Sequence, residues 1–166
     1  MLFADEHELI QRIAVALIRR KERLGTAESC TGGMIAAACT ELAGSSQWFE
    51  RGVVSYSNQA KTELLGVPPG LIETCGSVSE DVARHMARGL LAHAPVDWAV
   101  AVTGIAGPTG GSDAKPVGTV WLALAHDGRV LRAWQEHFAG DRHAVRAATV
   151  RVALEALCDA VEDRDA

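Results

Sequence analysis

Residues 98–104, WAVAVTG, form an uninterrupted apolar run that ends in glycine. Such a run is typical of a strand that is buried on both faces, because a strand with one wet face alternates apolar and polar residues. The run leads directly into the glycine-rich stretch IAGPTGGSDAKP. We therefore predict a central strand that delivers the chain into a binding loop over residues 104–116.

The segments around this strand alternate between helical and extended patterns. Apolar residues spaced three and four apart predict a first helix over residues 6–23, and further helices are predicted near 33–42, 58–66, 79–93 and 141–161. Ser79 is expected to cap the fourth helix. Strands are predicted at 51–57, 117–125 and 129–138, the last two joined at Asp127-Gly128. The pattern predicts one α/β domain over residues 1–166, with three layers and a mixed β-sheet that has helices packed on both faces.

Composition narrows the classes of function. The chain of 166 residues has a net charge of −5, which argues against non-specific binding to nucleic acid. It contains no apolar run long enough for a membrane span, and its acidic N-terminus is unlike a signal peptide, so we expect a cytoplasmic protein. The four cysteines form no CxxC pair, and neither HExxH nor HxE…PCxxC occurs. We expect reduced thiols, no disulfide framework and no metal site.

The stretch GTAESCTGG, residues 25–33, places two possible nucleophiles, Ser29 and Cys30, at the mouth of a predicted helix. Free backbone N–H groups at a helix start favour an anion or a developing oxyanion. The backbone of Thr31, Gly32 and Gly33 is therefore a candidate oxyanion and substrate contact, where the two glycines allow close approach. Ser29 is equally well placed as a plain helix cap.

A nucleophilic serine needs a base, and none of the six histidines lies in a loop of catalytic character. The segment VVSYSNQAK contains Tyr56, the only tyrosine, and Lys61 at the start of the next predicted helix. Adjacent strands of an α/β sheet bring their carboxyl-terminal loops together, so both side chains could approach Ser29. A buried lysine can act as a base. A core tyrosine and a surface lysine are the structural alternatives.

The stretch TGIAGPTGG, residues 103–111, offers backbone N–H groups to a phosphate or ribose. Its candidate contacts are Thr103, Gly104 and Gly107. It matches neither GxGxxG nor GxxxxGK[ST], so nucleotide binding by those two routes is unsupported. In GDRHAVR, Arg142 and Arg146 stand four residues apart on the last predicted helix, where they could clamp a phosphate or face solvent.

Read together, these motifs resemble one family. AESCTGG, GVVSYSNQAK, GSVSEDVARHMA, AVTGIAGPTGG, KPVGTV and a late GDR recur in this order in the CinA C-terminal domain family, and the resemblance spans residues 6–160. Many relatives carry a further N-terminal domain that resembles molybdopterin-binding proteins. This chain is similar to the stand-alone amidase form.

The resemblance implies a nicotinamide-nucleotide amidase that converts nicotinamide mononucleotide and water to nicotinate mononucleotide and ammonia. It implies Ser29 as the nucleophile, Lys61 as the base and Tyr56 as a group that relays or orients the proton. The glycine-rich loop and Arg142 would hold the ribose phosphate, no cofactor is expected, and a homo-oligomer is expected. Two alternatives stay open: a hydrolase that uses Cys30, and a nucleotide-binding module without catalysis.

Overall fold

A five-stranded mixed sheet forms the middle layer of the protein, whose computed structural model describes residues 2–164. The strand order is β2-β1-β3-β4-β5, with β1 parallel to both β2 and β3, and with antiparallel pairing from β3 through β5. The strands are β1 (Leu24–Glu28), β2 (Phe49–Val54), β3 (Trp98–Gly104), β4 (Thr119–His126) and β5 (Arg129–His137).

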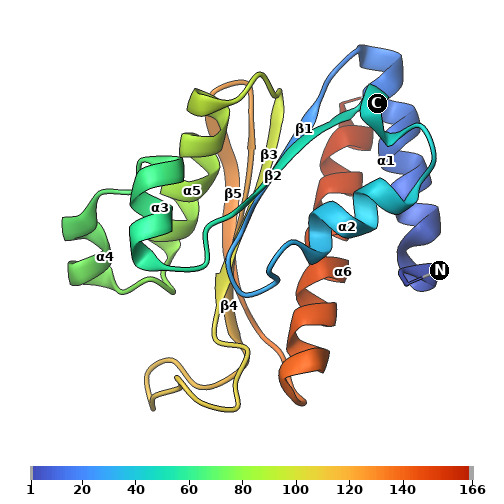
Figure 1. Cartoon of the computed structure of the whole chain (residues 1–166). Coiled ribbons are helices and arrows are strands. Elements are labelled where there is room, and N and C mark those ends of the chain that lie inside the picture. Colours follow the sequence, from blue (N-terminus) through green and yellow to red (C-terminus); the bar gives the residue numbers. More distant parts are fainter. Residues whose placement is uncertain (1, 165–166) are drawn as a thin grey trace.

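Helices cover both faces of this sheet (Figure 1). One layer contains α1 (His7–Arg20), α2 (Met34–Glu41) and α6 (Arg142–Asp163), and the other contains α3 (Asn58–Leu65), α4 (Pro69–Cys75) and α5 (Glu80–His93). Two 3-10 turns, Ala4–Glu6 and Ser45–Gln47, complete the elements of the described residues. Among the helices of residues 2–164, none combines the length and the apolar character that a membrane crossing requires. The predicted three-layer α/β architecture is confirmed.

The middle strand β3 separates two apolar cores. Its side chains alternate, so that Trp98, Val100 and Val102 belong to the core under α1 and α6, while Ala99 and Ala101 belong to the core under α5. All five are buried. The small side chains of Ala99 and Ala101 let α5 pack closely on the sheet. Burial on both faces explains why the strand lacks the apolar–polar alternation of a half-exposed strand.

One strand and one α-helix were absent from the sequence-based prediction. Strand β1 is five residues long, contains a glycine and ends in a glutamate, and these features hide a strand that is buried at every position. Helix α4 begins at Pro69 and spans only seven residues. The first helix ends at Arg20, earlier than predicted, because Lys21 adopts a left-handed conformation and the chain must then enter β1.

Other local predictions are confirmed. The side chain of Ser79 caps α5 by accepting a hydrogen bond from the Val82 N–H. At the β4–β5 hairpin, Asp127 and Gly128 both have positive φ, 50° and 76°, as a two-residue turn between twisted strands requires.

Parallel pairing gathers the functional motifs at one end of the sheet. Strands β1, β2 and β3 all run toward this end, where the turn after β1, the link from β2 to α3 and the glycine-rich loop after β3 meet (Figure 1). Helix α6 begins at the same end. A site at the carboxyl ends of parallel strands is the usual arrangement in such sheets.

Two glycines in helices test how closely α5 packs against α3. A Cβ atom at Gly89 in α5 would lie 1.7 Å from the Leu65 carbonyl oxygen, whereas one at Gly70 in α4 would meet no atom within 4 Å. We expect Gly89→Ala to lower the free energy of unfolding by about 2–4 kcal/mol. Gly70→Ala, the matched control, should be neutral or raise it by up to about 1 kcal/mol. Urea denaturation measures both, and equal effects would contradict this account of the α3–α5 contact.

Candidate active site

Ser29 is the first residue after strand β1. Its N–H donates to the Val102 carbonyl at 3.0 Å, which continues the pairing with β3, and its own carbonyl accepts from the Gly32 N–H at 3.0 Å. The N-cap residue of α2 is Gly33, which makes no side-chain hydrogen bond to the helix start. The helix-cap interpretation of Ser29 is therefore wrong, because the turn places Ser29 too far ahead of the helix.

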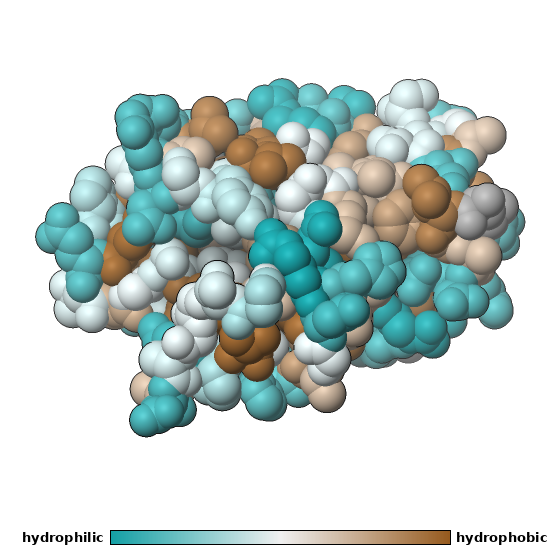
Figure 2. All heavy atoms as spheres, turned by 60° about the horizontal axis from the view of Figure 1, so that its bottom comes forward, coloured by the Kyte–Doolittle hydropathy of each residue, from teal (hydrophilic) through white to brown (hydrophobic). Residues whose placement is uncertain are grey.

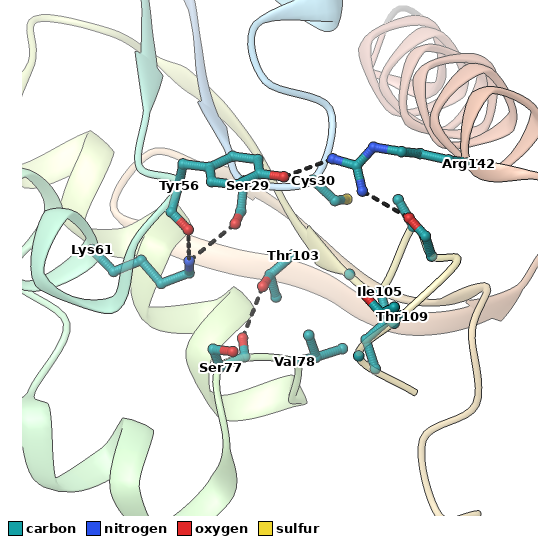
Figure 3. A pocket seen from close by; sticks show the side chains of 14 residues that line it. Ser29, Cys30, Tyr56, Lys61, Ser77, Val78, Thr103, Ile105, Thr109 and Arg142 are labelled. Atoms are coloured by element: carbon teal, nitrogen blue, oxygen red, sulfur yellow. Dashed lines mark hydrogen bonds between the residues drawn. The ribbon is translucent and has the colours of Figure 1, made fainter. Parts of the chain in front are cut away.

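The Ser29 hydroxyl faces the side chain of Lys61, which lies in the first half of α3. The Lys61 Nζ lies 3.0 Å from the Ser29 Oγ, although the two residues are 32 positions apart in the sequence. Figure 3 shows the two side chains pointing toward one another. Lys61 is only 1% exposed and Ser29 7%, so the surface-lysine interpretation is wrong.

Neutral oxygens surround the Lys61 amine. Besides the Ser29 hydroxyl, Nζ lies 3.0 Å from the Ser55 carbonyl and 3.4 Å from the Tyr56 carbonyl. Burial lowers the pKa of Lys61, because removal from water disfavours the ammonium form. A neutral amine has two N–H bonds and one lone pair. If the two carbonyls accept the N–H bonds, the lone pair faces the Ser29 hydroxyl, which is the geometry of a general base.

Tyr56 reaches the site in two different ways. Its carbonyl oxygen contacts Lys61, while its half-exposed ring carries the hydroxyl toward Arg142, whose Nη2 donates to it at 2.7 Å. Arg142 Nη1 also donates to the Gly107 carbonyl at 2.9 Å. The Tyr56 hydroxyl is thus hydrogen-bonded to an arginine. Arg142 joins the β2–α3 link to the glycine-rich loop across the cavity (Figure 3).

A cavity of about 250 Å³ opens beside Ser29 and Lys61. Figure 2 shows the end of the molecule where these loops gather, with hydrophilic and neutral residues around small separate hydrophobic patches. Both polar and apolar residues line the cavity, and the apolar ones include Val78, Ile105 and Ala106. Seven of the predicted site residues line it: Ser29, Tyr56, Lys61, Thr103, Gly104, Gly107 and Arg142.

Thr31, Gly32 and Gly33 are not among the residues that line this cavity. Thr31 is fully buried and its hydroxyl donates to Glu28 at 2.7 Å. The Gly32 N–H is already donated to the Ser29 carbonyl. Both glycines have positive φ, 60° and 99°, so their role in this structure is to turn the chain from β1 into α2. Their predicted contact with an oxyanion stays a prediction.

Cys30 also lines the cavity, but it is only 4% exposed, and burial raises the pKa of its thiol to about 11. Its Sγ lies close to Gly104, where a Cβ atom would be 3.1 Å away. A protonated thiol is a poor nucleophile. The other free cysteines of the described residues are Cys39 and Cys158, both buried, and the half-buried Cys75. Within residues 2–164 no three His, Cys, Asp or Glu side chains come together to hold a metal ion.

Sequence reasoning missed several residues that build the site. The Ser55 carbonyl holds Lys61, and Ser77 receives a hydrogen bond from the Thr103 hydroxyl at 2.8 Å through its own carbonyl. Both act through the main chain, which carries no side-chain signal. Glu28, next to Ser29, was visible in AESCTGG, but nothing in the sequence indicates that its carboxylate is buried.

Comparisons with known proteins identify the family of this chain. The family model described as the CinA C-terminal domain matches residues 6–161. A nicotinamide-nucleotide amidohydrolase PncC of Enterobacter agglomerans is 57% identical over 141 residues, which cover 84% of this chain and 85% of that protein. The protein of the same name from Escherichia coli (strain K12) is 48% identical over 150 residues, which cover 90% and 91%.

Solved structures share the fold of this chain. The crystal structure of the competence/damage inducible protein CihA from Agrobacterium tumefaciens superimposes with a TM-score of 0.91 at 46% sequence identity, and the match covers 96% of each chain. The similarity therefore includes the whole three-layer domain.

The Lys61 environment predicts an altered titration. We expect its amine to titrate below the ordinary value of 10.5, because burial penalises the ammonium. Between the two pKa values the unfolded chain binds more protons than the folded one, so the free energy of unfolding should rise with pH in this window. NMR of the lysine Cε signals, assigned with Lys61→Arg, measures the pKa. A Lys61 pKa at or above 10.5 would contradict the proposal that a neutral Lys61 amine faces the Ser29 hydroxyl.

Proposed function

Because the chain belongs to the CinA C-terminal domain family, we propose that it is a nicotinamide-nucleotide amidase that hydrolyses the carboxamide of nicotinamide mononucleotide. The observation that carries the proposal is the distance of 3.0 Å between Lys61 Nζ and Ser29 Oγ at the end of a cavity. Two relatives bear the name of this activity and align over most of their length. Water is the second substrate, and no cofactor enters the reaction.

In the first half of the proposed reaction, Lys61 accepts the proton of the Ser29 hydroxyl while Oγ attacks the carboxamide carbon. The resulting tetrahedral adduct collapses when the C–N bond breaks and Lys61 returns the proton to the departing nitrogen, which leaves as ammonia. In the second half, a water molecule loses a proton to Lys61 and attacks the acyl ester. Ser29 Oγ then leaves, regains its proton from Lys61, and releases the carboxylate.

The adduct needs hydrogen-bond donors for its oxyanion. The Gly32 N–H already bonds to the Ser29 carbonyl. We therefore assign this task to main-chain N–H groups of the cavity wall, at Cys30 and in the glycine-rich loop near Gly107. Arg142 lines the same cavity and supplies a positive charge for the phosphate of the nucleotide. The Tyr56 hydroxyl orients this guanidinium at 2.7 Å.

The rival proposals are less well supported. A Cys30 nucleophile would have to lose a proton from a thiol whose pKa burial raises to about 11. A binding module without catalysis would have no use for a buried lysine held against a serine hydroxyl. Two expectations remain predictions: the cytoplasmic location and the self-association that the family resemblance implies.

Two substitutions test the serine–lysine pair. Ser29→Ala and Lys61→Met should each lower kcat for ammonia release from nicotinamide mononucleotide by about 1,000-fold or more, because each removes a group from one dyad. The double variant should be no slower than the single ones. Coupled detection of ammonia measures turnover, and thermal melting checks the fold. Activity retained in a folded Ser29→Ala variant would overturn the proposal.

The cysteine offers a separate test. Cys30→Ala should keep kcat within about threefold of the unsubstituted protein, because a buried, protonated thiol contributes only packing. Iodoacetamide at pH 8, followed by peptide mass spectrometry, should modify the half-buried Cys75 before Cys30. Loss of activity that parallels alkylation of Cys30, and is absent in Cys30→Ala, would instead support a thiol nucleophile.

A further inference from the structure

Glu28 is a charged residue in the interior that the proposed reaction does not use. It ends strand β1, directly before Ser29, and its side chain is 0% exposed. An isolated carboxylate is costly to bury, so its partners must compensate for lost water. All four hydrogen bonds to it come from neutral donors of the protein.

These donors belong to three different parts of the chain. Oε1 accepts from the Thr31 hydroxyl at 2.7 Å and from the Ile35 N–H at 2.9 Å. Oε2 accepts from the Thr26 hydroxyl at 3.1 Å and from the Ala36 N–H at 2.9 Å. One carboxylate therefore joins the strand, the turn after it and the first turn of α2, where the helix dipole favours a negative charge.

The neighbours Glu28 and Ser29 contact opposite layers of the protein. Glu28 binds α2 on one side of the sheet, while Ser29 faces Lys61 of α3 on the other. The backbone between them is the point from which the hydroxyl projects. A misplacement of about 1 Å at a reacting group can cost about 100-fold in rate. A shift of the Glu28 carboxylate would therefore move the adjacent Ser29 and change the distance between Ser29 Oγ and Lys61 Nζ.

The Arg146 side chain of α6 donates hydrogen bonds to two main-chain carbonyl groups of the same turn. Its Nε donates to the Cys30 carbonyl at 3.1 Å and its Nη2 to the Thr31 carbonyl at 2.9 Å. It does not line the cavity beside Ser29. The turn is consequently held at the Thr31 side chain by an anion and at its main chain by a cation.

We infer that Glu28 is a positioning residue for the nucleophile, which acts through the Thr31 hydroxyl and the start of α2 to hold Ser29 Oγ against Lys61 Nζ. The inference rests on the proposed function in so far as Ser29 is the reactive group. It assigns Glu28 no contact with substrate and no part in proton transfer.

Two threonines provide a matched pair for the test. Thr26→Val and Thr31→Val each remove one hydroxyl donor from the same carboxylate, and both positions are 0% exposed. Only Thr31 lies in the turn after β1, which carries Ser29; Thr26 lies in β1, paired with strands on both sides. A purely structural role of Glu28 would lower the melting temperature in both variants without separating them in reactivity.

The readout is the rate at which phenylmethylsulfonyl fluoride labels Ser29, followed by peptide mass spectrometry, together with kcat and KM for ammonia release. Labelling requires a reactive Ser29 but no nucleotide substrate. We expect Thr31→Val and Glu28→Gln to lower both the labelling rate and kcat by about 10-fold or more, with KM within about threefold. Thr26→Val should stay within about twofold in labelling and kcat, even if its melting temperature falls.

The outcomes separate the two proposals. Equal labelling and kcat in folded Thr31→Val and Thr26→Val would overturn the positioning role, while the amidase activity would stand. Labelling of Ser29 that depends on Thr31 in a protein that releases no ammonia would support the positioning role and overturn the proposed substrate. A wild-type protein that is neither labelled at Ser29 nor active would overturn both. If Glu28→Gln fails to fold, the threonine pair decides.

Discussion

The parallel pairing of β1 with strands on both sides is the constraint on which the site depends. Because β2, β1 and β3 run in the same direction, their carboxyl ends and the segments that follow them must meet at one end of the sheet. Those segments are the turn that carries Ser29, the link that leads into α3 with Lys61, and the glycine-rich loop. No local preference of any one segment would bring the three together.

This arrangement buries two ionisable side chains, Glu28 and Lys61, on opposite faces of the sheet. Glu28 is compensated by four neutral donors, whereas Lys61 has only neutral acceptors and an amine pKa lowered by burial. The first environment suits a carboxylate with a structural role, and the second suits a base that gains and loses a proton. Adjacent residues, Glu28 and Ser29, connect the two environments.

Sequence patterns predicted most of the fold because the amphipathic helices and the buried strand have clear periodicities. They missed β1, since five residues with a glycine and a glutamate show neither alternation nor a continuous apolar run. They also left Ser29 between a helix cap and a nucleophile. A cap and a nucleophile have the same local sequence, and only the observed helix start at Met34 argues against the cap.

The sequence by itself determined the fold class, the glycine-rich loop after β3 and the residue types of the site, because periodicity and side-chain chemistry are local properties. The tertiary structure alone decided that Lys61 reaches Ser29 across 32 residues, that the Tyr56 hydroxyl pairs with Arg142, and that Gly32 and Gly33 lie outside the cavity. These relations depend on how strands pair and helices pack, and distances between segments remote in sequence are set only by that packing.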